Sequence, residues 1–98
     1  MHENRKLEVK QMLSVYLERE HSINTNRLFQ CLNPEHNDCH PSMGFYDKGT
    51  SPICHCFGCN ATYDIFDVIE LDYASNNPRD KFITAYKIFN KYKKEGFI

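Results

Sequence analysis

The chain has 98 residues, 41% of them hydrophobic, and a formal net charge of −1. This length suits one small domain over residues 1–98 and excludes an arrangement of several domains. A net charge close to zero excludes the strong, nonspecific affinity for nucleic acid of a basic domain. No run of about 20 apolar residues is present, so we expect no membrane-spanning helix and no membrane partner. Since no secretion signal is evident either, we expect a cytoplasmic protein with reduced thiols.

The first predicted element is an amphipathic helix over residues 5–20. Its apolar residues recur at helical spacing, with charged and polar residues between them. These apolar residues are Val9, Met12, Leu13, Tyr16 and Leu17. The polar segment that follows, residues 21–26, is expected to turn the chain.

Three short apolar runs come next, at residues 28–30, 43–46 and 53–55. Turn-forming Asn, Pro and Gly residues separate them. Short apolar runs between turns are typical of a small antiparallel meander. We therefore expect a ribbon of short strands within residues 27–62.

Two further helices are predicted in residues 64–95. Asp64 can cap the first of them, which continues through an apolar run. Asn77 can cap the second and Pro78 can be its first residue, with Gly96 as its stop. The expected buried stripe of this second helix consists of Phe82, Ile83, Tyr86, Phe89 and Tyr92. The fold class is thus a small α+β domain, in which a short meander carries an N-terminal helix and two C-terminal helices.

The close cysteine pair Cys56 and Cys59 predicts a metal site. The spacing lets both sulfurs face one ion, and Gly58 relieves backbone crowding between them. A redox pair at this spacing needs a thioredoxin-like βαβ setting, which the predicted elements do not provide. Cys54 and His55 alternate with Cys56 along a strand, so one of them points away from the metal. We expect packing or surface roles for both.

The remaining ligands are expected upstream, because structural zinc takes four ligands, usually as two close pairs. Cys31 is the third ligand in this interpretation. Spacing alone leaves His36, Cys39 and His40 open as the fourth. The expected cofactor is one structural Zn²⁺ at one end of the sheet.

These residues resemble the zinc-binding domain at the N-terminus of bacterial and phage DNA primases. The run His55-Cys56-Phe57-Gly58-Cys59 matches the family's second ligand pair, and Pro41-Ser42 stands five residues after His36, as in the family. The similarity extends from about residue 9 to about residue 89. It selects His36 as the fourth ligand, so that the expected set is Cys31, His36, Cys56 and Cys59. The first pair is spaced more widely than usual, and Asn60 and Tyr63 replace glycines common in the family.

The resemblance implies a zinc-ribbon module that contacts single-stranded template DNA and helps to select where primers start. A separate primase polymerase domain, and a replicative helicase, would be its partners in the primosome of a phage or mobile element. The chain itself offers no catalytic centre by sequence. Its clustered acidic residues fall at spacings of a solvated helix face, and they are Asp64, Asp67, Glu70 and Asp72.

Single-stranded DNA is usually held by aromatic rings that stack on bases and by cations that contact phosphates. The meander offers both, and period-2 alternation places Met43 and Phe45 on one face and Tyr46 on the other. One face must cover the core. We therefore expect DNA contacts from Arg27, Tyr46, Lys48 and His55.

Two other functions compete with this one. A zinc-stapled adaptor that binds proteins in a replication complex suits the near-neutral charge, and a redox switch at Cys54, Cys56 and Cys59 is disfavoured. The C-terminal lysines Lys91, Lys93 and Lys94 are expected to be a solvated helix end rather than a phosphate track.

Overall fold

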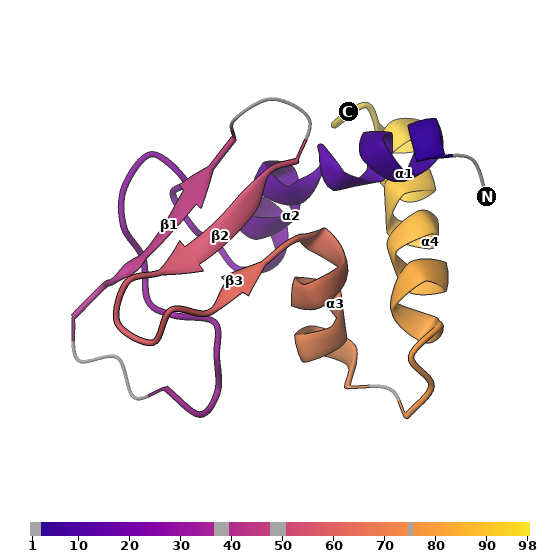
Figure 1. Cartoon of the computed structure of the whole chain (residues 1–98). Helices are drawn as coiled ribbons and strands as arrows, with labels where there is room; N and C mark the ends of the chain where they lie inside the picture. Colours follow the sequence, from indigo (N-terminus) through magenta and orange to yellow (C-terminus); the bar gives the residue numbers. More distant parts are fainter. Residues whose placement is uncertain (1–2, 37–39, 48–50, 75) are drawn as a thin grey trace.

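The computed structural model describes residues 3–36, 40–47, 51–74 and 76–98. Its elements in chain order are α1 (Glu3–Lys10), α2 (Leu13–Glu20), β1 (Met43–Tyr46), β2 (Ile53–Cys56), β3 (Thr62–Tyr63), α3 (Ile65–Tyr73) and α4 (Asp80–Glu95). The strands lie at one end of the molecule with α2 behind them, and α3 and α4 stand side by side at the other end (Figure 1). The architecture is α+β, as predicted.

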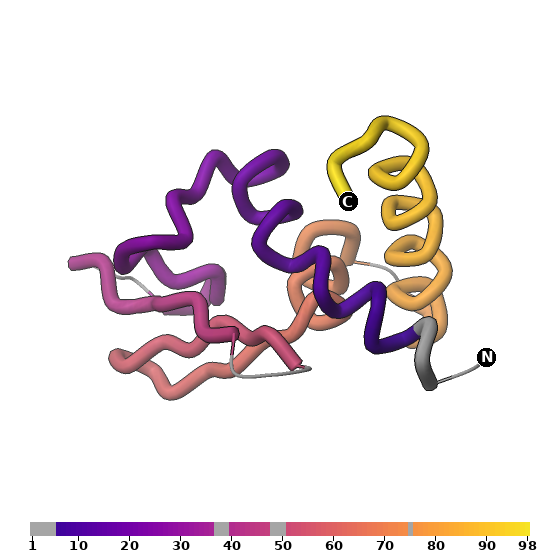
Figure 2. The backbone as a smooth tube through the Cα atoms, turned by 90° about the horizontal axis from the view of Figure 1, so that it is seen from above, coloured from indigo at the N-terminus to yellow at the C-terminus, as the bar shows by residue number. Residues whose placement is uncertain are grey.

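The predicted helix over residues 5–20 is two helices, α1 and α2, so its continuity was predicted wrongly. The amides of Gln11 and Met12 each lie 3.1 Å from the carbonyl oxygen three residues earlier. Such bonds tighten a helix into a turn. Because of the break, the apolar side chains of the two halves pack in different places: α1 lies against α3 and α4, whereas α2 lies beside the sheet (Figure 2).

The sheet is antiparallel with the order β1-β2-β3. Its outline was predicted, but its membership differs. Of the run at residues 28–30, only Phe29 pairs, through two backbone hydrogen bonds of 2.8 and 2.9 Å with Met43. The third strand is instead β3, whose two residues are too few to give a periodic signal.

The two faces of the sheet follow the predicted alternation. Residues paired across strands share a face, so the register Gly44↔His55 and Phe45↔Cys54 divides the side chains into two sets. Met43, Cys54 and Cys56 are buried in the core. The opposite face, which we call the outer sheet face, carries Gly44, Tyr46, Ile53, His55 and Thr62. In Figure 2, α2 lies on one side of the sheet. The core side chains of the sheet belong to the same buried cluster as those of α2, so the outer sheet face is turned away from this helix.

The helix α3 begins as predicted. The Asp64 carboxylate accepts from the amide of Asp67, and the Asp67 carboxylate accepts from the amide of Asp64, each at 3.0 Å. This reciprocal capping satisfies two amides that a helix start leaves without partners. The chain leaves α3 at Ala74, which has a left-handed backbone with φ of 43°.

The helix α4 begins later than predicted. Asn77 accepts a hydrogen bond from the amide of Arg79 at 3.0 Å, and this turn leads into a helix that starts at Asp80 rather than at Pro78. Gly96, with φ of 84°, ends the helix, which agrees with the prediction.

The buried stripe of α4 was predicted in part: Phe82 and Tyr86 are half-buried and pack against the core, Ala85 was not predicted, and Ile83 was placed on the wrong face. Ala85, Phe89 and Tyr92 are buried, whereas Ile83 is 53% exposed. With 3.6 residues per turn, Ile83 lies about 180° around the helix from Tyr92, and so it cannot share its face. None of the helices in the described ranges is long and apolar enough to cross a membrane.

Candidate metal centre

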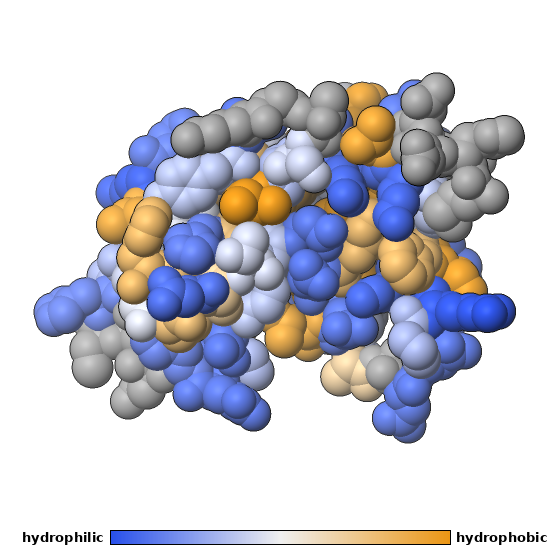
Figure 3. Space-filling view, viewed as in Figure 1, coloured by the Kyte–Doolittle hydropathy of each residue, from blue (hydrophilic) through white to orange (hydrophobic). Residues whose placement is uncertain are grey.

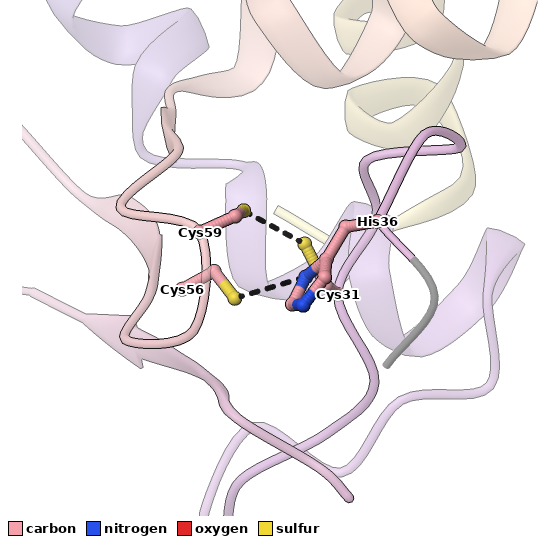
Figure 4. A group of neighbouring side chains, drawn as sticks. All are labelled: Cys31, His36, Cys56 and Cys59. Carbon is pink, nitrogen blue, oxygen red and sulfur yellow. Dashed lines mark hydrogen bonds between the residues drawn. The ribbon is translucent and has the colours of Figure 1, made fainter. Parts of the chain in front are cut away.

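Three cysteines and one histidine gather at the end of β2, where the chain turns towards β3. Cys31 Sγ lies 3.7 Å from Cys59 Sγ, and Cys56 Sγ lies 3.6 Å from Nδ1 of His36 (Figure 4). The four ligand atoms all lie within 4.8 Å of one another. They come from two segments 20 residues or more apart in sequence, and their side chains point at a common centre. This group could hold one metal ion.

A tight turn delivers His36 to the centre. The amide of His36 donates to the carbonyl of Asn33 at 3.0 Å, and the Asn33 side chain accepts from the amide of Glu35 at 3.0 Å. Asn followed by Pro is a favoured start of such a turn. The turn takes up the extra residues between Cys31 and His36, so the wide spacing does not prevent the two side chains from converging.

A second turn holds Cys56 and Cys59. The amide of Asn60 donates to the carbonyl of Cys56 at 2.8 Å, and the amide of Cys56 donates to the carbonyl of Ala61 at 2.9 Å. Asn60 has a φ of 63°, a left-handed conformation that Asn adopts more readily than other residues with side chains. Asn60 can therefore stand at a position where the resemblance described above would lead one to expect glycine.

The surroundings of the sulfurs stabilise negative charge unequally. Burial acts to raise the pKa of Cys56, but hydrogen bonds from Ser42, at 3.3 Å, and from the amides of Cys59 and Gly58 outweigh it and bring that pKa to about 6. Burial and the neighbouring sulfurs raise the pKa of Cys31 to about 12. The protein itself therefore supports the thiolate of Cys56, whereas a cation is needed to make the thiolate of Cys31 favourable.

Cys54 is outside this centre. It is fully buried on the core face, and burial alone raises its pKa to about 12. Such a thiol is unreactive. The expected packing role of Cys54 therefore agrees with the structure. Of the alternative ligands, His40 is exposed, and Cys39 lies outside the described residues.

The predicted DNA-binding residues that the structure describes lie around the outer sheet face. Tyr46 and His55 belong to that face, and Arg27 and Tyr46 line one hollow of about 260 Å³. Lys48 lies outside the described residues. Sequence reasoning missed Phe57, which is 63% exposed and packs edge-on against both Tyr46 and His55. Extending the alternation of residues 53 and 55 by one step would have found it.

The acidic residues do not gather into a metal-binding group in the described part of the chain. Asp64 and Asp67 cap α3, and Glu70 lies 3.3 Å from Nζ of Lys81. Asp72 is not merely solvated, since it accepts hydrogen bonds from Tyr16 and His21.

Comparisons of the chain with known protein families, with curated proteins and with solved structures found no match.

Proposed function

We propose that this chain is the zinc-binding module of a DNA primase, which contacts single-stranded template DNA and helps to select where primers start. The observation that carries the proposal is the position of the Cys/His centre directly beside an aromatic cluster in which Phe57 is exposed. Cys56 is flanked in sequence by His55 and Phe57, whose rings lie 4.9 Å apart on the outer sheet face. One local structure thus provides both the metal site and the surface that would contact DNA.

Zinc is the metal that this centre fits best. Zn–S bonds of about 2.3 Å and Zn–N bonds of about 2.0 Å in a tetrahedron place two sulfurs about 3.8 Å apart and a sulfur and a nitrogen about 3.5 Å apart. The corresponding distances here are 3.7 and 3.6 Å. Thiolate and imidazole ligands suit Zn²⁺, and a set of four protein ligands leaves no open position for a substrate, which favours a structural role.

The outer sheet face offers rings for stacking. Tyr46 packs edge-on against Phe57 with ring centroids 6.1 Å apart, and Phe57 packs edge-on against His55. Phe57 therefore keeps an exposed ring supported by two neighbours. Supported rings lose little entropy on binding a base, and stacking contributes about 1–3 kcal/mol per base.

Arg27 adds a cation next to these rings. It is exposed on the loop that follows α2, and across the hollow lie Gly44 and Tyr46. The ring of Tyr46 covers Gly44, where a Cβ atom would lie only 2.6 Å from the tyrosine oxygen. A nucleotide bound at this hollow could place its base against Tyr46 and its phosphate near Arg27.

A DNA titration at several salt concentrations tests the proposal. The zinc-loaded chain should bind a single-stranded oligonucleotide modestly, and binding should weaken as salt rises, because phosphate contacts release counterions. Replacing Arg27 and Lys48 together by Ala should weaken binding and flatten the salt dependence. Arg79→Ala, which changes an exposed cation far from the sheet, is the matched control. Undiminished binding by the double variant would place the DNA site elsewhere.

The alternative function is a zinc-stapled adaptor that binds proteins of a replication complex. The net charge of −1 favours it, because little long-range attraction to DNA is expected. In that case the titration should show no DNA binding at low salt. In either case the pure chain should make no primers from nucleoside triphosphates, and primer synthesis by the chain alone would contradict both functions.

A further inference from the structure

We propose that α4 carries a docking surface for an acidic peptide segment of a partner protein, with one large apolar side chain in that segment. The surface combines an apolar hollow at the start of α4 with a row of lysines farther along the helix. We call it the α4 surface, and its residues are Lys6, Arg79, Phe82, Ile83, Lys87, Lys91 and Lys94.

The hollow has a volume of about 360 Å³ and is lined by Lys6, Arg79, Phe82 and Ile83. Ile83 is 53% exposed, and Nζ of Lys6 lies 5.3 Å from the centroid of the Phe82 ring. Phe82 and Ile83 thus form the apolar part of the lining, and Lys6 and Arg79 add two cationic side chains. Figure 3 shows apolar side chains gathered about halfway along α4, with hydrophilic side chains directly below them. A large apolar side chain flanked by carboxylates complements this hollow in both shape and charge.

The lysine row continues from the hollow along α4. Ile83, Lys87, Lys91 and Lys94 fall within about 80° of the helix circumference, opposite the buried stripe. All are exposed, and none of the three lysines has an ion-pair partner among the described residues. The acidic residues of α4 stand at its two ends, Asp80 and Glu95, with five lysines and no acid between them. The middle of α4 therefore presents positive charge that its own helix does not neutralise.

An acidic peptide fits this surface better than nucleic acid does. Burying Ile83 gives a favourable free energy only if the partner brings apolar area, which a phosphate backbone lacks. Stacking rings, the usual feature of a surface for single strands, lie on the outer sheet face instead, where Phe57 is exposed. The sheet and α4 lie at opposite ends of the molecule (Figure 1), so both surfaces can be occupied at once.

The test is a titration of the ¹⁵N-labelled, zinc-loaded chain, followed by amide chemical shifts. The probe is a synthetic peptide in which Asp and Glu flank one Phe, and the matched peptide has Ser in place of Phe. Shifts should concentrate on residue 6 and on residues 79–94. Ile83→Ser and the double variant Lys87→Glu, Lys91→Glu should each weaken peptide binding about tenfold. Arg27→Ala should leave it unchanged, which separates this surface from the proposed DNA site.

Several outcomes would overturn the proposal. One is the lack of saturable shifts up to about 1 mM peptide, since affinity weaker than this is not specific docking. Another is equal binding of the Ser peptide, which would remove any role for the hollow. A third concerns the double lysine variant. If it loses oligonucleotide binding but keeps peptide binding, the lysine row binds phosphates of nucleic acid rather than an acidic peptide. The exposed positions of all three residues make unfolding of these variants unexpected, and circular dichroism checks it.

Discussion

Gly58 and His36 approach so closely that a side chain on the glycine would collide with the imidazole. A Cβ atom at position 58 would lie 2.8 Å from Cε1 and 3.2 Å from Nε2 of His36. The glycine is therefore needed for the histidine of one turn to reach the cysteines of the other. This contact was invisible in the sequence, where Gly58 was explained only by crowding between Cys56 and Cys59.

The first prediction follows from this contact. Gly58→Ala should push His36 away from the centre and lower metal affinity by about 10–100-fold, the usual effect of disturbing the residues that position a ligand. Competition with a zinc chelator of known affinity measures it. Ser51→Ala, at an exposed position away from the centre, is a suitable control. Unchanged affinity of Gly58→Ala would mean that His36 is not a ligand or moves without cost.

The second prediction concerns the choice of ligands. His36→Ala should weaken metal binding far more than His40→Ala or Cys39→Ala, because the His36 imidazole nitrogen already lies 3.6 Å from Cys56 Sγ. Cobalt substitution gives a direct measurement, since the visible spectrum reports the number of thiolate ligands. A spectrum of four thiolates, abolished by Cys39→Ala, would show that the resemblance to primases fails at this position.

The third prediction is that removal of the metal disorganises the sheet end of the domain. Structural zinc contributes about 10–16 kcal/mol of apparent binding free energy, comparable to the whole stability of a small domain. Met43, Cys54 and Cys56 belong to the same core as the helices, so the loss should spread. Thorough chelation should lower the melting temperature and change the circular dichroism, and zinc should restore both. An unchanged spectrum after verified metal removal would contradict this expectation.

The parts of the fold that could be predicted from the sequence are those marked by a periodic pattern or by a residue type with a strong local preference, such as a helix cap. The capping position of Asp64, the stop at Gly96 and the alternation through Met43 and Phe45 depend on neighbouring residues alone. The break between α1 and α2 was not predicted, because its cause is the packing of two helix halves against different surroundings. Ile83 was misplaced because its neighbour Phe82 sits at the edge of the buried stripe, where hydrophobicity does not decide the face.

The candidate site shows the same division. Spacing identified Cys56 and Cys59 as a pair but left the fourth ligand open among three residues. The choice of His36 depended on family resemblance, and the Asn33–His36 turn supplies the local geometry that spacing could not. Phe57 was missed as a surface residue because it was considered only as part of the cysteine turn.

The fourth prediction concerns alkaline pH. Tyr16 is buried and donates to Asp72, and burial first, then this hydrogen bond, raises the pKa of its hydroxyl far above the usual value of about 10. A group whose pKa is raised on folding contributes stability that is complete below the unfolded pKa and declines as pH rises above it. Stability should therefore fall above about pH 10, by at most about 1.4 kcal/mol per pH unit for this group.

Thermal melting between pH 8 and 11 measures this effect. Tyr16→Phe should be less stable at neutral pH by about 1 kcal/mol, because a hydrogen bond is lost, yet its stability should fall less steeply at high pH. Tyr73→Phe, at an exposed position, is the control. Parallel pH profiles of the wild type and Tyr16→Phe would show that other groups, such as Tyr92, dominate the alkaline transition.

The last prediction tests stacking on the outer sheet face. Phe57→Ala should weaken binding of single-stranded DNA by about 5–150-fold, which corresponds to about 1–3 kcal/mol of lost stacking. The ring is 63% exposed, so its removal should change the melting temperature and the zinc content little. Phe57→Tyr should bind nearly as well as the wild type, because it retains the ring. The salt dependence should be the same in all three proteins, since Phe57 contacts no phosphate through charge.

DNA affinity can be measured by fluorescence anisotropy with a labelled oligonucleotide. If Phe57→Ala binds DNA like the wild type while Arg27→Ala does not, the cation contributes without the rings, and the stacking role of this face is wrong.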